Sequence, residues 1–300
     1  MSENKTRPIL VTGANGMLGR DLLKVLASSK RSVIATDSNG SGEASSSLDI
    51  SNEMAVKSFV GETKPRVIVN CAAYTNVDGA ESDSTNAYLV NAIAVAHLAL
   101  AAAQVNARLI HISTDYVFSA MANRESPLAE DEKCDPKSVY GASKLYGELL
   151  LRQILPQQSV ILRTSWLHGV NGGNFIDTML KLAKERNSIS VVNDQIGSPT
   201  WTVWLAQIID RFIDREDLSG VFHASSRGGI SWNDFAKEIF RQAGLDIEVT
   251  PQTTEEMGRP APRPLFSTLD VSKLEAALEL TAPDWQLFVT EHLRAQGVIK

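Results

Sequence analysis

Short apolar runs recur along the first half of the chain, and their β-branched character is typical of strands buried on both faces. These runs are the segments 9–11, 33–35, 67–69, 109–112 and 160–162. Longer helical patterns separate them: Leu18, Leu22 and Leu26 place one apolar stripe on a helix, and an alanine-rich run covers 91–103. Strand and helix in repetition predict an α/β fold with a doubly wound parallel sheet and helices on both sides.

The strand–helix rhythm changes after about Arg163, where loops rich in Gly, Asn, Ser and Pro begin. Ser231 and Asp234 have the spacing of a capping box, so they predict a helix that Gly244 ends. The segment 259–264 holds three prolines and is predicted as loop. We therefore predict two domains, 1–164 and a smaller α/β domain 165–300, with a helix near 203–216 returning to the first.

Composition narrows the function classes. The chain has 300 residues, 43% of them hydrophobic, and a net charge of −6, without a Lys/Arg block that would follow a phosphate backbone. We find neither a secretory h-region in the first ten residues nor a run of about 18 apolar residues. Cys71 and Cys134 form no CxxC motif. These observations predict a cytoplasmic protein with no nucleic-acid partner, no membrane partner, no disulfide and no structural zinc.

A glycine loop follows the first strand and opens the first helix. Gly13 suits a tight turn, Gly16 lets the backbone approach a diphosphate at the helix N-terminus, and Gly19 allows close helix–strand packing. Asp37 ends the second strand and can accept hydrogen bonds from a ribose diol, which favours NADH, although Arg20 lies close in sequence. The region therefore predicts a Rossmann-type, NAD(P)-binding domain; a loop shaped by glycines without a ligand is the alternative.

The candidate catalytic side chains lie at the end of the fourth strand run and on the helix after it. Thr114 ends that strand, and Tyr140 and Lys144 stand four residues apart, so they share one helix face. The ammonium is expected to lower the pKa of the phenol and make Tyr140 a general acid for the alkoxide that forms when hydride reaches a ketone. A solvated Tyr–Lys pair is the alternative. His111 lies inside the strand and is interpreted as a hydrogen-bonded core residue.

These motifs resemble the extended short-chain dehydrogenase/reductase superfamily and, within it, the dTDP-4-dehydrorhamnose reductase family. The resemblance runs through nearly the whole chain. It is carried by 13–19, 70–73, 113–118, 140–148, 163–166, 174–180, 194–200, 231–232 and 263–267. It implies reduction of the C4 ketone of dTDP-4-dehydro-L-rhamnose to dTDP-L-rhamnose with NADPH or NADH, with Thr114, Tyr140 and Lys144 as catalytic residues.

Site residues follow from the glycine loop and from this resemblance. Besides Tyr140 and Lys144, the predicted cofactor residues are Gly13, Asn15, Gly16, Met17, Leu18, Gly19, Asp37, Asp49, Ile50, Ala72, Ala73, Tyr74 and Asn91. The predicted substrate residues are Thr75, Val77, Asp115, Trp166, Asn174, Gln195 and Arg263. An indole face suits a sugar ring, and a guanidinium suits a diphosphate. A helix-start role for Asp49, a core role for Trp166 and a helix cap for Asn174 stay open as alternatives.

The sequence departs from the family pattern in two places. Ser119-Ala120 stand where the family commonly has Asp-Gly, and Gly79 stands where it commonly has Lys. Some members form a dimer bridged by Mg²⁺ on acidic residues, and Asp21 matches one such position. We cannot assemble a complete ligand set, so Mg²⁺ stays a possible cofactor that is not required, and a homodimer stays a possible assembly.

Other functions remain open at this point. A sugar-nucleotide 4,6-dehydratase is disfavoured, because Asp115 is followed by Tyr116 and not by the Glu that supplies the base in that family. Another dTDP-deoxysugar 4-ketoreductase fits the same motifs, since one sequence does not fix the pose of the sugar. A noncatalytic subunit, resembling the regulatory subunit of methionine adenosyltransferase, shares the fold.

Overall fold

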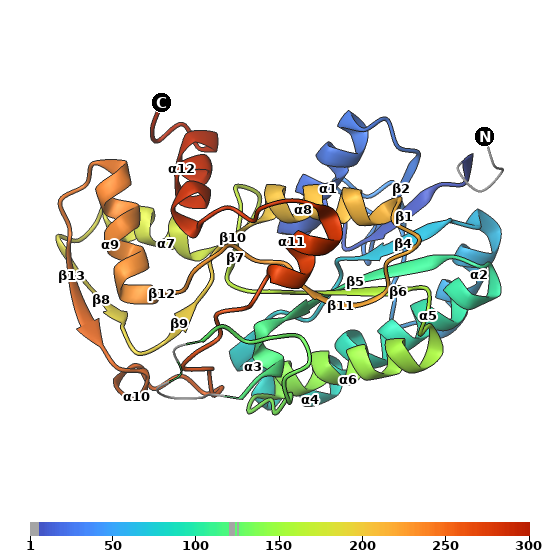
Figure 1. Ribbon diagram of the computed structural model, residues 1–300, viewed down its shortest axis with the longest axis horizontal. Helices are drawn as coiled ribbons and strands as arrows, with labels where there is room; N and C mark the ends of the chain where they lie inside the picture. The colour runs from blue at the N-terminus through green and yellow to red at the C-terminus, as the bar shows by residue number, and fades with distance from the viewer. Residues whose placement is uncertain (1–5, 120–123, 125) are drawn as a thin grey trace.

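The protein is built around one parallel sheet of seven strands (Figure 1). The computed structural model describes residues 6–119, 124 and 126–300. The strand order is β11 (Gly220–His223), β6 (Ser159–Thr164), β5 (Arg108–Thr114), β4 (Val67–Asn70), β1 (Ile9–Thr12), β2 (Val33–Asp37) and β3 (Ser46–Ser47). Every pairing between neighbours is parallel. The predicted α/β, doubly wound sheet is confirmed, and the five predicted runs are β1, β2, β4, β5 and β6.

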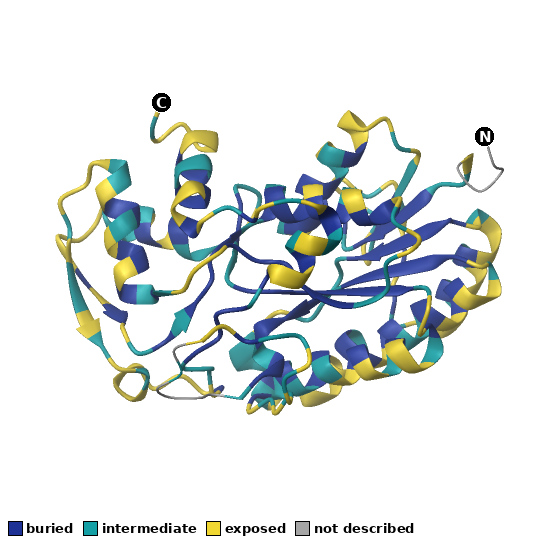
Figure 2. Ribbon diagram, in the orientation of Figure 1, coloured by how far each residue is buried: buried dark blue, intermediate teal, exposed yellow. Residues whose placement is uncertain are grey.

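Helices cover both faces of the sheet because alternate strand residues point to opposite sides. In β1, Ile9 and Val11 join a core with Leu22 of α1 (Met17–Ser28) and with α8 (Thr202–Ile213). Leu10 instead joins a second core with α2 (Glu53–Thr63), α5 (Ala94–Gln104) and α6 (Val139–Ile154). Figure 2 shows the strands as a buried layer between the two sets of helices. The glycine loop and α6 are therefore anchored on the same sheet.

A second layer of structure lies beyond the carboxyl ends of the strands (Figure 1). Its core joins α7 (Phe175–Leu182), α9 (Trp232–Ala243) and α12 (Trp285–Ala295) to β8 (Ser188–Val192), which pairs in parallel with β13 (Glu248–Gln252). The predicted limits of α9 are confirmed: the Ser231 side chain accepts from the Asp234 N–H, and Gly244 ends the helix at φ 68°. The proline-rich segment 259–264 is loop, as predicted.

Several shorter elements complete the fold. They are α3 (Val77–Ser82), α4 (Ser84–Tyr88), a π-helical turn η2 (Leu89–Ile93), a 3₁₀ turn η3 (Asp115–Val117), β7 (Leu167–His168), β9 (Ile196–Gly197), β10 (Thr200–Trp201), β12 (Ile230–Ser231), α10 (Thr254–Met257) and α11 (Ser272–Leu278). Between residues 165 and 300 the chain also returns to the sheet, because α8 packs on α1 and β11 pairs with β6. The division at residue 164 stays a prediction, but the sheet itself extends past it.

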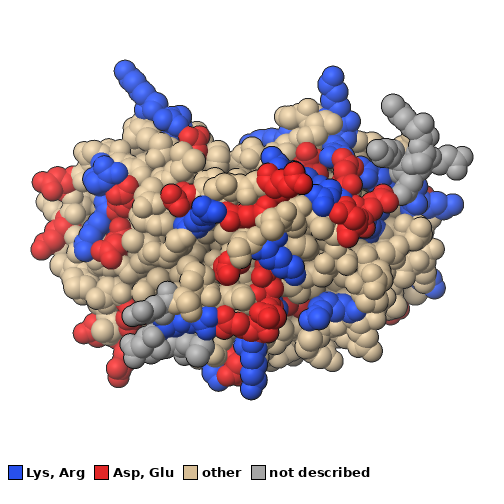
Figure 3. All heavy atoms as spheres, in the orientation of Figure 1, with Lys and Arg blue, Asp and Glu red and all other residues tan. Residues whose placement is uncertain are grey.

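One helical stretch, Ser84–Gln104, has the length and apolar character of a membrane span. Half of its most apolar window is buried inside the protein, and core helices pass the same test. Its α5 portion packs on α2 and α6. Charged side chains of both signs are mixed over the face shown in Figure 3.

The α1 stripe offers a test of the first core. Leu22 is fully buried there, so Leu22→Ala is expected to lower the free energy of unfolding by about 2–5 kcal/mol. Leu287→Ala on α12 is the matched control, because Leu287 is 49% exposed and its truncation should cost less than about 1 kcal/mol. Urea unfolding of both variants measures the difference, and equal losses would contradict this packing.

Candidate active site

Thr114 and Tyr140 meet at the carboxyl end of β5. Thr114 is the last residue of the strand and the N-cap of η3; its Oγ1 accepts from the Tyr116 N–H and donates to Asp115 Oδ1 at 3.1 Å. Tyr140 lies in the first turn of α6, whose N-cap is Ser138, and the Thr114 hydroxyl acts to lower the pKa of its phenol. Two of the three predicted catalytic groups are thus brought together by a strand end and a helix start.

Lys144 follows one turn later on α6, and its side chain is 2% exposed. Its Nζ donates to the Ile112 carbonyl at 2.6 Å and lies 3.3 Å from His111 Nε2. Burial lowers the pKa of Lys144 to about 8, although Glu148 and Cys71 act to raise it. The lysine is therefore held by β5, one helix turn after Tyr140.

The expected lowering of the Tyr140 pKa is contradicted in direction. Burial raises the pKa of Tyr140 to about 12, with the Thr114 hydroxyl acting against the shift and Asp115 adding to it. The Lys144 ammonium is turned toward Ile112, so desolvation of the phenolate dominates. Tyr140 consequently stays protonated at neutral pH, which is the state that a proton donor requires.

A buried ion pair fixes α6 against the sheet. Arg163 of β6 donates to both carboxylate oxygens of Glu148, with Nη2 to Oε2 at 2.7 Å, and both side chains are at most 3% exposed. Ser113 Oγ also donates to Glu148. Sequence reasoning included both residues in motifs but assigned them no role. A carboxylate one turn after the lysine and an arginine inside a buried strand are the signal that could have paired them.

The glycine loop has the geometry of a dinucleotide cradle. Gly13 has φ 70°, and a Cβ there would lie 2.5 Å from the Ala72 nitrogen. A Cβ on Gly19 would lie 2.2 Å from the Gly13 carbonyl oxygen. Gly16 is the N-cap of α1 and supplies no side-chain cap, so the first N–H groups of that helix are available to an anion. Met17 and Leu18 begin the helix.

Asp37 lies against this loop, as a ribose-binding carboxylate would. Its Oδ2 accepts from the Asn15 N–H at 3.1 Å, and its Oδ1 accepts from the Ser38 N–H at 2.9 Å. Arg20 Nε donates to the Asn15 carbonyl. The Asn15 amide itself contacts the backbone of Ser41 and Glu43, so it ties the neighbouring polar loop to the glycine loop.

Other predicted cofactor residues make structural contacts. Asn91 is buried, and its amide bonds the N–H and the carbonyl of Tyr74 and the Ser143 hydroxyl. Asp49 accepts from the backbone and the hydroxyl of Ser51. Ile50 is buried in the core. Ala72 lies directly beside Gly13, and Ala73 follows it.

Trp166 is the most unusual of the predicted substrate residues. It is a non-glycine residue at φ 46°, and its indole stacks on Trp232 with ring centroids 3.4 Å apart and an interplanar angle of 4°. A Cβ on Gly197 would lie 2.4 Å from the same indole. Trp232 therefore covers one face of the ring that was expected to pack on a sugar. Sequence reasoning assigned no site role to Trp232, although this residue directly follows the helix cap Ser231.

Asn174 and Gln195 are engaged within the second layer. The Asn174 side chain is the N-cap of α7: its Oδ1 accepts from the Asp177 N–H, and its Nδ2 donates to the Gly169 carbonyl at 2.8 Å. Asn174 thus has the helix-cap role that the sequence left open as the alternative to substrate binding. Gln195 is 4% exposed, and its Nε2 donates to Thr254 Oγ1 at 2.9 Å.

Arg263 forms a two-pronged ion pair with Asp78 of α3. Its Nη1 and Nη2 lie 3.0 and 2.9 Å from the two carboxylate oxygens, and Arg259 adds a contact at 3.3 Å. These cations hold the pKa of Asp78 below its usual value. The pair joins the proline-rich loop to the sheet layer, beside the predicted substrate residues Thr75 and Val77.

Asp115 is buried, and no ion pair to it is found among the described residues. It accepts from Thr114 and, through Oδ2, from the Ser165 hydroxyl at 3.0 Å. Burial raises its pKa to about 6 while these hydroxyls act to lower it. Of the two positions that depart from the family pattern at 119–120, Ala120 lies outside the described residues.

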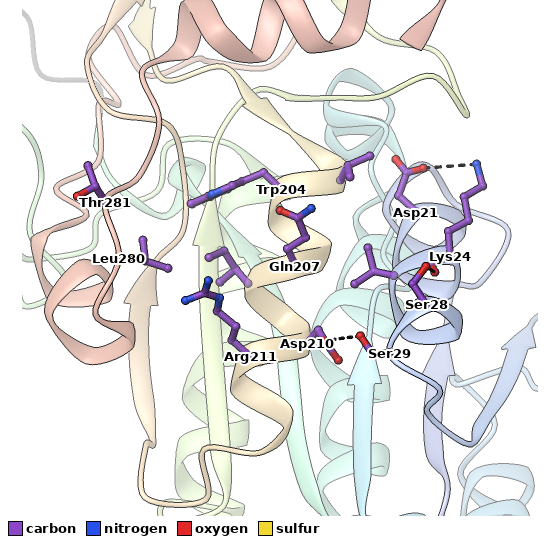
Figure 4. Close-up of a pocket in the computed structure, with 13 residues that line it drawn as sticks. Asp21, Lys24, Ser28, Ser29, Trp204, Gln207, Asp210, Arg211, Leu280 and Thr281 are labelled. Atoms are coloured by element: carbon purple, nitrogen blue, oxygen red, sulfur yellow. Dashed lines mark hydrogen bonds and ion pairs between the residues drawn. The ribbon is translucent and has the colours of Figure 1, made fainter.

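Asp21 does not lie beside Thr114 and Tyr140. It lines a groove of about 600 Å³ between α1, α8 and residues 280–281 (Figure 4). Its oxygens accept from Thr202 Oγ1 at 2.6 Å and from Asn171 Nδ2 at 2.8 Å, and Lys24 lies 3.8 Å away. Among the described residues there is no group of three or more His, Cys, Asp or Glu arranged to hold a metal ion. A Mg²⁺ site at Asp21 is not supported.

Comparisons with known proteins bear on this site. Residues 6–297 match the family model described as RmlD substrate binding domain. A dTDP-4-dehydrorhamnose reductase of Streptomyces griseus is 41% identical, covering 95% of this chain and 93% of that one. A dTDP-4-keto-6-deoxy-D-glucose reductase of Streptomyces niveus is 40% identical, with 87% of each chain covered. The crystal structure of a dTDP-4-dehydrorhamnose reductase from Bacillus anthracis in complex with NADP is 39% identical, with TM-score 0.90 and coverage of 96% and 99%.

The tryptophan stack can be tested at Gly197. Gly197→Ala places a methyl group against the Trp166 indole, so the stack must shift; we expect a loss of about 1–3 kcal/mol in unfolding free energy and a changed near-UV circular dichroism spectrum. Gly173→Ala is the control, since a Cβ there meets nothing within 4 Å. An unchanged spectrum in Gly197→Ala would contradict the stacked geometry.

Proposed function

The chain belongs to the dTDP-4-dehydrorhamnose reductase family, and we propose that it reduces the C4 ketone of dTDP-4-dehydro-L-rhamnose to dTDP-L-rhamnose with NADPH or NADH. The enzyme is an NAD(P)H-dependent oxidoreductase acting on a dTDP-sugar. The observation that carries the assignment of residues is the meeting of Thr114 and Tyr140 at the carboxyl end of β5, the edge where ligands of doubly wound sheets bind.

The proposed reaction needs one hydride and one proton. A nicotinamide cofactor, when bound, would supply the hydride to C4. Tyr140 gives its phenolic proton to the oxygen on C4, and the Thr114 hydroxyl orients that oxygen. The raised pKa of Tyr140 keeps this proton in place until negative charge develops on the oxygen. Lys144 returns a proton to the phenolate from the neighbouring helix turn, since its pKa lies near 8.

The glycine cradle and Asp37 support the cofactor part of the proposal. The bare N-terminus of α1 would hold the diphosphate, and the Asp37 carboxylate would accept from the adenosine ribose. That carboxylate repels a 2′-phosphate, so we propose that NADH is accepted at least as readily as NADPH. Asn91, Asp49 and Ile50 would act indirectly, by shaping the loops around the cofactor.

The second layer would hold the nucleotide sugar. Arg263 would meet the diphosphate only by leaving or sharing Asp78, so substrate binding exchanges one anion for another at this guanidinium. Trp166 would present the edge or the face not covered by Trp232. Asp115 and Thr75 would contribute polar contacts, whereas Asn174 and Gln195 would shape the pocket through their own hydrogen bonds.

A second candidate is another dTDP-deoxysugar 4-ketoreductase. A relative from Streptomyces niveus that is named dTDP-4-keto-6-deoxy-D-glucose reductase favours it, because the site residues alone do not fix the pose of the sugar. A noncatalytic subunit is disfavoured by the assembled Thr114–Tyr140 pair. A cytoplasmic location and a homodimer remain predictions.

The proton donor is tested by Tyr140→Phe. The variant loses only the hydroxyl, so kcat for the ketosugar should fall by about 10²–10⁴-fold while the cofactor Kd stays within about twofold. Stopped-flow NADPH oxidation and fluorescence titration measure the two quantities. The control is Tyr146→Phe, on the same helix but 47% exposed, which should keep wild-type rates. Wild-type protein that oxidises neither NADPH nor NADH with this ketosugar, or with its C5 epimer, would remove the reductase proposal.

Cofactor preference is tested by Asp37→Asn. Removing the negative charge should raise kcat/KM with NADPH relative to NADH by about fivefold, as expected for about 1 kcal/mol of repulsion at the protein surface. Asp210→Asn is the control, because Asp210 lies on α8 and pairs with Arg31. A ratio that does not move in Asp37→Asn would show that this carboxylate is only a turn residue.

A further inference from the structure

Four polar side chains form a row across the sheet and end at the catalytic lysine. Thr12, Asn70 and His111 are paired neighbours on β1, β4 and β5. Thr12 Oγ1 donates to Asn70 Oδ1 at 2.7 Å, Asn70 Nδ2 contacts His111 Nδ1 at 3.1 Å, and His111 Nε2 lies 3.3 Å from Lys144 Nζ. Because Thr12 directly precedes Gly13, the row connects the glycine loop to Lys144.

The partners of the Asn70 side chain determine which group donates and which accepts in each of the next hydrogen bonds of this row. Asn70 Oδ1 accepts from the Ala72 N–H at 3.1 Å as well as from Thr12, so the oxygen and nitrogen of this amide cannot be exchanged. Asn70 Nδ2 must then donate to His111, and His111 Nδ1 must accept.

His111 carries a single ring proton. The side chain is fully buried, and burial with the nearby Lys144 charge lowers the pKa of His111 well below its usual value, so the ring is neutral. With Nδ1 as the acceptor, the proton must be on Nε2. That N–H faces Lys144 Nζ. An amine lone pair can accept from it, whereas an ammonium cannot.

We propose that His111 is a positioning residue which, locked as the Nε2–H tautomer by Asn70 and Thr12, lowers the proton affinity of Lys144. The lysine then acts as a proton reservoir near neutral pH while it donates an N–H to the Ile112 carbonyl. The other ionisable groups facing Lys144 are Glu148 on α6, which is paired with Arg163, and Cys71 after β4. The inference rests on the proposed role of Lys144 in the reductase reaction.

Two variants separate this role from simple packing. In Asn70→Asp only acceptors face His111, so the tautomer should change to Nδ1–H and Nε2 should accept from the ammonium. Glu148 and Cys71 are untouched. We expect the alkaline limb of kcat/KM, near pH 8 in the wild type, to rise by about one unit, a tenfold change in proton affinity. In His111→Gln the side chain can still accept from Asn70 and donate to Lys144, so the limb should stay near pH 8.

The tautomer is measured directly by ¹⁵N NMR of the full-length protein with labelled histidine, using His111→Gln to assign the signal. The expected wild-type signal is Nε2–H, and the expected Asn70→Asp signal is Nδ1–H. A wild-type Nδ1–H signal overturns the proposal, as does a limb that stays fixed in Asn70→Asp or that moves without a change of tautomer. A wild-type protein that reduces no ketosugar would instead count against the proposed function. The NMR result would still test the tautomer in that case.

Discussion

The candidate site depends on the contact between the start of α6 and the carboxyl end of β5, which a buried ion pair holds in place. Glu148 receives donors from Arg163 and Ser113, so one carboxylate connects α6 to two adjacent strands. Removing one partner of such a pair leaves an uncompensated buried charge, at a cost of about 3–5 kcal/mol. The pair lies one turn beyond Lys144, so the position of the lysine depends on it.

A site built in this way has its electrostatics set mainly by desolvation. Around Tyr140, Lys144 and Asp115, burial is the largest influence on each pKa, and it favours the neutral form of every group. A ketone reductase needs a protonated phenol before hydride transfer, and burial supplies this state without help from the lysine. In the proposed reaction the Lys144 ammonium would act afterwards, when a phenolate has formed and a proton must be returned.

The sequence was sufficient for the elements whose physics is local. The β-branched runs predicted five strands of the sheet, the Leu18–Leu22–Leu26 stripe predicted α1, and Ser231 with Gly244 predicted both ends of α9. It also placed Thr114, Tyr140 and Lys144 on one strand end and one helix face. Side-chain direction was the part it could not supply, because the pose of Lys144 depends on the Ile112 carbonyl and on His111, which come from another strand.

Contacts between distant segments account for the other differences. Trp232 is 66 positions from Trp166, and Asp78 is 185 positions from Arg263, so no spacing rule indicates that they meet. Both contacts occupy groups that were predicted to hold substrate: an indole face is covered, and a guanidinium already has an anion. A site with its binding groups paired in this way avoids leaving a buried cation or a wet apolar surface in the absence of ligand. Under the proposed function, substrate would displace or share Asp78 at Arg263, so the binding energy there would be the difference between two contacts of similar chemistry. In the proposed exchange a diphosphate would outcompete Asp78 because it carries more charge than one carboxylate, whereas a neutral sugar would not, so the exchange would favour nucleotide sugars over free sugars.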